Sequence, residues 1–255
     1  MMKPPLRIAI LECDTPLDRT RSKYGGYGGV FAALLRAGAS SLPSPNLDPS
    51  RDLILTTHDV VNVESYPKLD AIDAVLLTGS RHSAFDNDPW IVRLVDFTRK
   101  VIEEQDRVRV IGVCFGHQIV GRAMGMKVQR ADEGWEISVC GMDVTEKGME
   151  LFKIDGKTLY LQQMHRDIIA EYPKHVERLG SSPRCQVQGM HKKNKLITVQ
   201  GHPEFNREIV TEILDARHEA GIFDDSMHQE GLERVANHHD GTKVSQAFLR
   251  FLLDD

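Results

Sequence analysis

Apolar and polar positions follow two patterns along the first half of the chain. Short apolar runs bounded by glycine or polar residues are typical of buried strands, and apolar residues three to four positions apart are typical of helices. The stretch from Pro89 to Gln105 shows the helical pattern, with its proline near the first turn, where a helix tolerates it. The predicted strands are Leu6–Leu11, Asp52–Thr57, Ala74–Thr78 and Arg109–Val113, and the other predicted helices are Gly28–Ala37, ended by Gly38, and Gly116–Met124. Strands that alternate with helices predict a parallel sheet with helices on both faces.

The second half of the chain has a different pattern. Its short apolar segments follow one another without intervening helices, and its last part is helical again. The predicted strands are Val128–Arg130, Ile137–Val144, Thr158–Leu161 and a hairpin of Cys185–Met190 with Leu196–Gln200, and the predicted helices are Arg207–Ala220, Glu230–Ala236 and Val244–Leu253. We expect an α/β domain over residues 5–220, with a flavodoxin-like, doubly wound, mostly parallel sheet and an antiparallel addition. Residues 221–255 are expected to form a helical C-terminal extension packed on the same domain.

The segment GVCFG (residues 112–116) joins a predicted strand to a predicted helix. Small residues on both sides of a nucleophile are typical of a tight strand-to-helix turn that presents the side chain at the end of a sheet. The N-terminus of the following helix favours a thiolate and offers a free N–H group to a negatively charged oxygen. Because ligands of open α/β sheets bind at the carboxyl ends of the strands, we interpret Cys114 as a nucleophile. The other three cysteines lack this context and are interpreted as structural.

A second motif, GHPEF (residues 201–205), follows another apolar strand. A thiolate nucleophile needs a base, and the base needs a group that orients it. Pro203 stiffens the segment, so that His202 and Glu204 can point the same way, as an imidazole and its carboxylate partner do. If this strand adjoins the strand that ends at Cys114, the two motifs form a Cys–His–Glu triad.

The motifs GVCFGHQ and GHPEF, in this order, resemble those of the class I glutamine amidotransferases of the triad type. The family pattern is an apolar strand followed by G-x-C-x-G-x-Q, then H-P-E near the end of the domain. An oxyanion loop follows an earlier strand, usually as Leu-Ser-Gly-Gly-Pro, and here LTGSR (residues 77–81) keeps the first glycine and departs from the pattern after it. The stretches KYGGYGGVF and TGSRHSAFDNDPWI further resemble a subgroup of free-standing fungal amidotransferase-like proteins and plant γ-glutamyl peptidases.

The resemblance implies a hydrolytic reaction. Cys114 would attack the γ-carbonyl of a glutamine or γ-glutamyl group and form a covalent γ-glutamyl thioester. His202 would protonate the leaving nitrogen and later activate water, and Glu204 would orient the imidazole. The products would be glutamate and ammonia or an amine.

The resemblance also implies residues that hold the oxyanion and the substrate. The backbone N–H of Phe115 and one from Gly79 or Ser80 would stabilise the oxyanion. Gln118 lies one helical turn after the cysteine and is expected beside the bound substrate. His165 lies in the segment QMHRD (residues 163–167), which falls together with GWEI (residues 134–137) where the family has substrate-side loops.

Four hypotheses about function remain open at this stage. A glutaminase that supplies ammonia to a separate synthetase chain and a γ-glutamyl peptidase that acts on glutathione-like compounds would use the same triad. A non-catalytic regulatory protein on the same fold is disfavoured, because such a protein need not retain Cys114, His202 and Glu204 together. A cysteine-dependent stress or redox protein fits the His-Pro-Glu motif poorly.

Composition and charge exclude several other classes of function. The 255 residues are 41% hydrophobic and 27% charged, and a net charge of −5 does not favour a nucleic acid as a partner. No apolar run approaches the roughly 20 residues of a membrane span, and the first residues do not fit a signal peptide. Four scattered cysteines indicate a reducing compartment, so we expect a cytoplasmic protein. The resemblance implies that its partner is a small-molecule substrate, glutamine or a γ-glutamyl compound.

No cofactor or metal is predicted. The glycine-rich stretch YGGYGG (residues 24–29) lacks both the Lys-Ser/Thr ending of a P-loop and the spacing of a dinucleotide site, and is interpreted as a tight loop near the pocket. The segment HHD (residues 238–240) is the tightest cluster of potential metal ligands, but its polar surroundings are typical of a solvated loop. His117 is interpreted as a helix-face residue rather than a second base.

Overall fold

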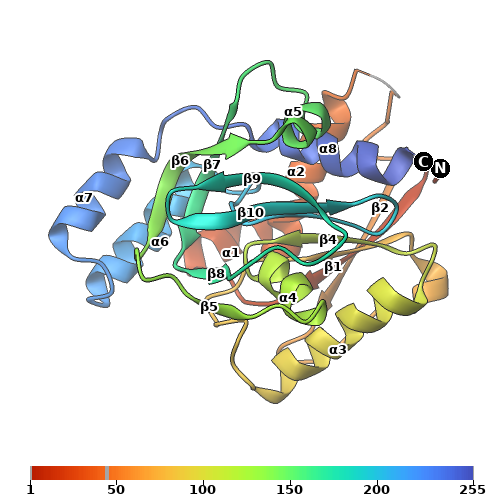
Figure 1. The fold of residues 1–255 in the computed structure, drawn as a ribbon, viewed down its shortest axis with the longest axis horizontal. Helices are drawn as coiled ribbons and strands as arrows, with labels where there is room; N and C mark the ends of the chain where they lie inside the picture. Colours follow the sequence, from red (N-terminus) through yellow and green to blue (C-terminus); the bar gives the residue numbers. More distant parts are fainter. Residues whose placement is uncertain (1, 44–45, 255) are drawn as a thin grey trace.

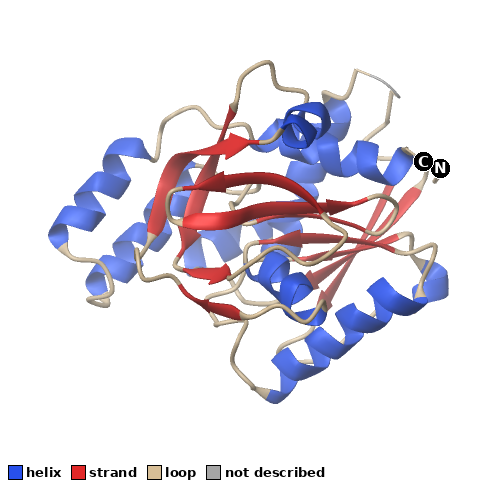
Figure 2. Ribbon diagram, in the orientation of Figure 1, coloured by secondary structure: helices blue, strands red, loops and turns tan. Residues whose placement is uncertain are grey.

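A nine-stranded sheet forms the centre of the protein in the computed structural model, which describes residues 2–43 and 46–254 (Figures 1 and 2). Its strands are β1 (Leu6–Glu12), β2 (Leu53–Asp59), β3 (Ala74–Leu77), β4 (Arg109–Val113), β6 (Glu136–Val144), β7 (Thr158–His165), β9 (Glu177–Ser182), β10 (Cys185–Lys192) and β11 (Leu196–Val199). Two further strands, β5 (Val128–Arg130) and β8 (Asp167–Ile169), pair outside this sheet.

The order of the strands divides the sheet into a parallel and an antiparallel part. The order is β2-β1-β3-β4-β11-β10-β9-β6-β7. Neighbouring strands are parallel from β2 to β11, and antiparallel from β11 to β7. The predicted α/β fold with an antiparallel addition, including the hairpin of β10 and β11, is therefore confirmed.

The register of the central strands brings their carboxyl ends together. Leu77 of β3 lies opposite Gly112 of β4, and Val199 of β11 lies opposite Val113 of β4. The segments that follow these three strands therefore emerge side by side at one edge of the sheet, where open α/β sheets bind their ligands. They contain the predicted oxyanion loop, the cysteine corner and the His-Pro-Glu motif.

Helices cover both faces of the sheet, as Figures 1 and 2 show. One face packs against α3 (Pro89–Glu104) and α4 (Phe115–Ala123), whose apolar residues share a buried cluster with the sheet. The other face packs against α2 (Tyr27–Ser40), α5 (Glu146–Phe152) and α8 (Gly241–Leu253). A third cluster joins α6 (Arg207–Glu219) to β6, and α7 (Asp225–Arg234) packs beside it. A short α1 (Asp18–Tyr24) precedes α2, and a 3-10 turn spans Leu69–Ala71.

The prediction that Gly38 ends its helix is wrong, because α2 continues to Ser40. The glycine serves helix packing instead of helix termination. A Cβ at Gly38 would lie only 2.2 Å from Oγ of Ser245 on α8, and that hydroxyl donates a hydrogen bond to the Leu34 carbonyl at 2.9 Å. The missing side chain thus lets α2 and α8 approach closely.

The strand predicted over Thr158–Leu161 is too short, because β7 continues to His165. Residues 162–165 are mostly polar, yet all of them are buried, since they pair with β6 from Glu136 to Val139. The segment QMHRD is therefore mostly strand rather than loop. Buried polar strand residues of this kind are invisible to a hydropathy pattern, which also missed α1, α5, β8 and β9.

The C-terminal helix α8 lies in the larger buried cluster. Phe248 is fully buried there, together with Phe31 and Leu35 of α2. We expect Phe248→Ala to lower the free energy of unfolding by about 3–5 kcal/mol, the usual cost of deleting a buried phenylalanine side chain. Urea unfolding measures it, with Val63→Ala as the control because Val63 is 70% exposed. A loss equal to that of the control would show that α8 does not unfold with the core.

No helix in residues 2–43 and 46–254 is both long and apolar enough to cross a membrane.

Candidate active site

Cys114 lies at a sharp corner between β4 and α4. Its backbone has a φ of 52° and a ψ of −107°, a conformation that L-residues rarely adopt and that is typical of a strained functional position. Glycine is required at both flanking positions because a side chain would not fit there. A Cβ at Gly112 would lie 2.9 Å from the carbonyl oxygen of Gly116, and a Cβ at Gly116 would lie 2.3 Å from that of Leu77.

Hydrogen bonds to both neighbouring strand ends hold this corner. The N–H of Cys114 donates to the carbonyl of Val199 at 3.0 Å, and the N–H of Gly116 donates to the carbonyl of Thr78 at 3.1 Å. The corner is therefore fixed to the ends of both β11 and β3. Phe115 is the first residue of α4, where backbone N–H groups lack partners within the helix.

His202 and Glu204 form a buried pair just after β11. Nδ1 of His202 lies 2.7 Å from Oε1 of Glu204, and the Glu204 side chain has no exposed surface. Because a carboxylate only accepts, Nδ1 carries the proton and Nε2 is left for other chemistry. The His202 ring also stacks on Phe205, with ring centroids 4.0 Å apart and planes parallel within 1°. These contacts hold the imidazole in one orientation.

The cysteine and the histidine meet next to Gly79. A Cβ placed on Gly79 would lie 2.7 Å from Cε1 of His202 and 3.7 Å from Cβ of Cys114. Burial alone would lower the pKa of His202, but the charges and hydrogen bonds of Cys114 and Glu204 outweigh it and raise that pKa to about 10. The imidazole is therefore positively charged at neutral pH and lies between Cys114 and Glu204.

Asp14, which follows β1, holds the loop after β3 in place. The N–H of Arg81 donates to Oδ2 of Asp14 at 2.8 Å, and its guanidinium pairs with Oδ1 at 2.9 Å. The N–H of His82 donates to Oγ of Ser80 at 3.1 Å. Among the described residues, the amides of Gly79 and Ser80 have no acceptor, so both are available to a ligand.

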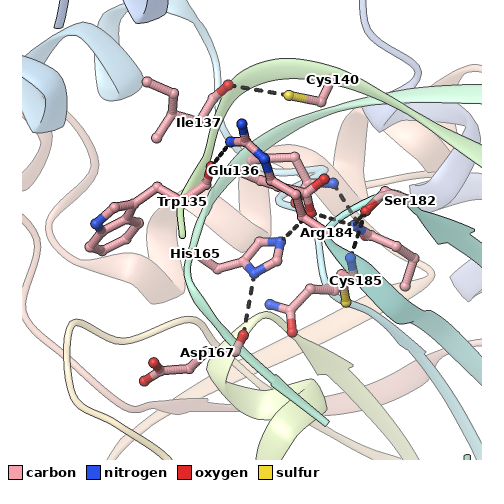
Figure 3. Close-up of polar contacts among 12 residues, drawn as sticks. Trp135, Glu136, Ile137, Cys140, His165, Asp167, Ser182, Arg184 and Cys185 are labelled. Atoms are coloured by element: carbon pink, nitrogen blue, oxygen red, sulfur yellow. Dashed lines mark hydrogen bonds and ion pairs between the residues drawn. The ribbon is translucent and has the colours of Figure 1, made fainter. Parts of the chain in front are cut away.

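The side chains of Gln118 and His165 both line the cavity beside Cys114. Nε2 of Gln118 donates to the carbonyl of Asp167 at 2.7 Å and to Oε1 of Gln200 at 3.0 Å. Figure 3 shows the His165 ring between two acceptors. Its Nε2 lies 3.0 Å from Oε2 of Glu136, at ion-pair distance, and its Nδ1 lies 3.3 Å from the Asp167 carbonyl oxygen. The ring nitrogens thus hold the cavity wall together.

Glu136 belongs to a buried polar network behind His165 (Figure 3). Nε2 of Gln188 donates to Oε2 of Glu136 at 2.8 Å and to Oγ of Ser182 at 3.1 Å. Burial tends to raise the pKa of Glu136, but the hydrogen bond and charge of His165 outweigh it, so that the pKa is lowered. The carboxylate is ionised at neutral pH and anchors the wall.

A cavity of about 390 Å³ opens over Cys114. On one side its lining comes from segments that follow the parallel strands: Asp14 and Thr15 after β1, residues 79–83 after β3, and His202 after β11. The lining also contains Trp135, Arg166 and Arg217, which lie together because both arginines contact the Trp135 ring. The sequence analysis missed Asp14 and Arg217, and it placed Arg166 in a substrate-side segment without giving it a role. Arg217 gives no signal in sequence, because a single arginine on an amphipathic helix looks like an ordinary surface residue.

His117 and three of the cysteines have structural surroundings. His117 is fully buried, with Nδ1 2.8 Å from Oγ1 of Thr198 and Nε2 3.0 Å from a backbone carbonyl, and burial lowers its pKa to about 3. The ring is therefore neutral and is no second base. All four cysteines are free. Burial raises the pKa of Cys13 to about 12 and also raises the pKa of Cys140 and Cys185, which disfavours their thiolates.

Within the described parts of the chain, no group of three His, Cys, Asp or Glu side chains could hold a metal ion. The interpretation of residues 238–240 as a solvated loop is wrong for Asp240, which is only 7% exposed. Asp240 accepts a hydrogen bond from the N–H of Tyr160 at 3.0 Å and pairs with Lys243 at 3.0 Å, so it anchors the start of α8.

The protein has an open α/β sheet with a cysteine at a strand–helix corner. A His–Glu pair that follows the neighbouring strand lies next to this cysteine. These features define a class of α/β proteins with a cysteine at the strand–helix corner. Comparison with known proteins specifies the class further. Residues 51–216 match the model of the family glutamine amidotransferase class-I. A glutamine amidotransferase-like protein of Schizosaccharomyces pombe is 33% identical over 97% of this chain and 98% of its own length. The chain belongs to the class-I glutamine amidotransferase family.

Two further comparisons agree with this assignment. γ-Glutamyl peptidase 5 of Arabidopsis thaliana is 34% identical over 84% of this chain and 82% of its own length. The crystal structure of a glutamine amidotransferase from Thermotoga maritima matches the fold with a TM-score of 0.74, covering 99% of this chain and all of the other, at 16% identity. The subgroup suggested by the sequence is confirmed, and the chain is an enzyme of the glutamine amidotransferase type.

Proposed function

We propose that the protein hydrolyses γ-glutamyl amides through a covalent γ-glutamyl thioester on Cys114. The observation that carries this proposal is the meeting of Cys114 with the His202–Glu204 pair, together with the raised pKa of His202. A thiolate opposite an imidazolium is a competent nucleophile at neutral pH, and the imidazolium is a competent acid.

The reaction divides into two steps with balanced proton transfers. In the first step the Cys114 sulfur attacks the γ-carbonyl carbon, the C–N bond breaks, and His202 gives its proton to the leaving nitrogen. In the second step His202, now neutral, takes a proton from water, the hydroxide attacks the thioester carbonyl, and the thiolate leaves. Glutamate and an amine or ammonia are released, and the imidazolium is restored.

The oxyanion of both steps would be held by backbone N–H groups. Phe115 offers the amide at the start of α4, and Gly79 and Ser80 offer the two free amides of the loop after β3. One such donor contributes about 3–4 kcal/mol to stabilising the transition state. Gln118 and His165 would line the substrate on the other sides of the cavity.

Two kinds of activity share this chemistry. The names of the plant relatives favour a γ-glutamyl peptidase that needs no acceptor, whereas the family name favours a glutaminase that passes ammonia to a separate synthetase chain. A regulatory protein without catalysis remains the third proposal, and it is disfavoured by the complete Cys–His–Glu arrangement. In each catalytic case the reaction would use no cofactor.

Glutamate release by the purified protein distinguishes these proposals. Glutamine and glutathione are supplied in parallel, with Cys114→Ala as the blank. Release from glutathione, with little from glutamine, identifies a γ-glutamyl peptidase, and release from glutamine identifies a glutaminase. If neither substrate nor simple γ-glutamyl dipeptides yield glutamate above the blank, the hydrolytic proposal is wrong.

Asp14 is expected to position the oxyanion loop. The family pattern usually has a proline where this chain has Arg81, and a proline could not donate the backbone hydrogen bond that Asp14 accepts. We expect Asp14→Ala to lower kcat by about 10- to 100-fold with little change in KM, since small misplacements of donors cost this much. Asp14→Asn, which keeps an acceptor oxygen, should retain more activity. Equal kcat values for wild type and Asp14→Ala would contradict this role.

A further inference from the structure

Two arginines that line the cavity lie over the same tryptophan. The guanidinium carbon of Arg217 is 4.4 Å from the centroid of the Trp135 ring, and that of Arg166 is 5.0 Å from it. Arg217 also lies 5.6 Å from the ring of Phe223. Contacts with aromatic rings fix the plane of a guanidinium without using its N–H donors. The donors of both arginines therefore remain available.

Among the described residues, neither arginine forms an ion pair with a carboxylate, which sets this pair apart from the other arginines of the cavity. Arg81 pairs with Asp14, and Arg130 pairs with Asp167 at 3.3 Å. The charges of Arg166 and Arg217 are not compensated in this way, although the whole chain is acidic with a net charge of −5.

Burial and the charge of Arg166 both disfavour the charged form of Arg217. Burial lowers the pKa of Arg217, interactions with Cys114, Tyr27 and Asp14 raise it, and the charge of Arg166 lowers it, so that the pKa is lowered overall. Two guanidiniums close enough to repel each other, neither of them paired with a carboxylate in the part of the chain that the structure describes, are typical of a site that receives an anion from a ligand. Because the interaction with Cys114 raises the pKa of Arg217, this site also borders the reacting atoms.

The position of Arg217 indicates which part of the substrate the site faces. Helix α6, which carries Arg217, begins immediately after the His202-Pro203-Glu204-Phe205 segment. Ile213 and Arg217 of this helix both line the cavity. His202 gives its proton to the leaving nitrogen in the proposed reaction, so the departing amine lies near His202 and the start of α6. Gln118, which is expected beside the γ-glutamyl part of the substrate, belongs to a different helix, α4.

We propose that Arg166 and Arg217, held over Trp135, bind a carboxylate carried by the leaving amine, so that the preferred substrates are γ-glutamyl amides of an amino acid or short peptide. This inference rests on the proposed function. Arginine forks bind carboxylates through paired, charge-assisted hydrogen bonds, which make the contact specific as well as strong. Glutamine, whose leaving group is ammonia, leaves the site empty.

The test compares γ-glutamylglycine with γ-glutamylethylamide, which have leaving groups of similar size that differ in the carboxylate. We expect wild type to have a kcat/KM at least about 10-fold higher for γ-glutamylglycine. Arg217→Gln and Arg166→Gln should each lower kcat/KM for γ-glutamylglycine by about 10- to 100-fold, the usual effect of losing a hydrogen bond to a charged group, and change the ethylamide value by less than about 3-fold.

Arg178→Gln is the matched control. Arg178 also lies 5.0 Å from the centroid of an aromatic ring, that of Tyr172, but it is not part of the cavity lining. It should leave both substrates unaffected. An equal loss on both substrates in Arg217→Gln would overturn the proposal, because the arginine would then bind the γ-glutamyl part or act on folding. An unchanged preference for γ-glutamylglycine in both arginine variants would overturn it too.

Binding measured without turnover separates this inference from the proposed function. In the Cys114→Ala background, calorimetry should show tighter binding of γ-glutamylglycine than of γ-glutamylethylamide, and Arg217→Gln should abolish the difference. If wild type releases no glutamate but this binding pattern appears, the hydrolytic proposal fails and the carboxylate site stands. If γ-glutamylglycine does not bind, or binds no better than the ethylamide, the carboxylate site is wrong.

Discussion

Cys114→Ser is expected to lower kcat/KM for the best γ-glutamyl substrate by more than about 1,000-fold, with the fold retained. A serine hydroxyl keeps its proton at neutral pH, so His202 loses its anionic partner and the ready nucleophile is gone. Removing the nucleophile from a catalytic triad costs as much as removing the whole triad, which leaves only the effects of binding and the oxyanion donors. Glutamate release under single-turnover conditions measures the loss.

Cys185→Ser is the control for this variant. Cys185 is equally buried, but its thiol pKa is raised and it has no part in the proposed reaction, so activity should change little once stability is accounted for. An independent readout comes from the imidazole. The charge of Cys114 is the largest cause that raises the pKa of His202, so NMR titration of Cys114→Ala should show that pKa well below about 10. A Cys114→Ser variant with near-normal turnover would rule out the thioester.

The cysteine corner was predictable because its chemistry is local. Gly112 and Gly116 are adjacent to Cys114 in the chain, and the space that each glycine frees lies within the same strand–turn–helix unit or against the next strand. The apolar run of β4 has the predicted bounds, Arg109–Val113, because it is buried on both faces. The link to His202 needed only one tertiary fact, the pairing of β11 with β4.

The strand conformation of the polar residues at the end of β7 could not be predicted, because nothing local marks them as buried. Gln162, Gln163 and His165 are polar but lie in a strand, where one nitrogen of each side chain finds a hydrogen-bond partner, in Val235, Gln188 and Asp167 respectively. A hydropathy pattern reads such residues as loop.

The arginine pair escapes sequence reasoning for a related reason. Trp135, Arg166 and Arg217 come from three separate segments, and only the folded chain shows that both arginines contact the tryptophan and that neither has a carboxylate partner within residues 2–43 and 46–254. Departures from the family motif are explained in the same way. Arg81 replaces the usual proline of the oxyanion loop, and its compensation, Asp14, is 67 residues away in sequence.

The second large effect is expected for His202→Gln, which should lower kcat/KM by at least about 1,000-fold. Glutamine approximates the size of the imidazole and can still contact Glu204, but it can neither carry the positive charge opposite Cys114 nor transfer a proton. General acid and base catalysis alone contributes about 100- to 10,000-fold, and loss of the thiolate's counter-charge adds to this. Glutamate release and the rate of alkylation of Cys114 by iodoacetamide should fall together. A fall in only the first would indicate that His202 acts on proton transfer alone.

Glu204→Gln provides the graded comparison, because it keeps an acceptor for Nδ1 but removes the charge. In wild type the imidazolium persists until the pH passes its pKa of about 10, so activity should decline only at high pH, as the acid that protonates the leaving nitrogen is lost. Glu204 is one of the groups that raise this pKa, so the alkaline decline of kcat/KM should move to lower pH in Glu204→Gln, and activity at neutral pH should fall less than in His202→Gln. An alkaline limb at the same pH in both proteins would show that Glu204 orients the ring without supporting its charge.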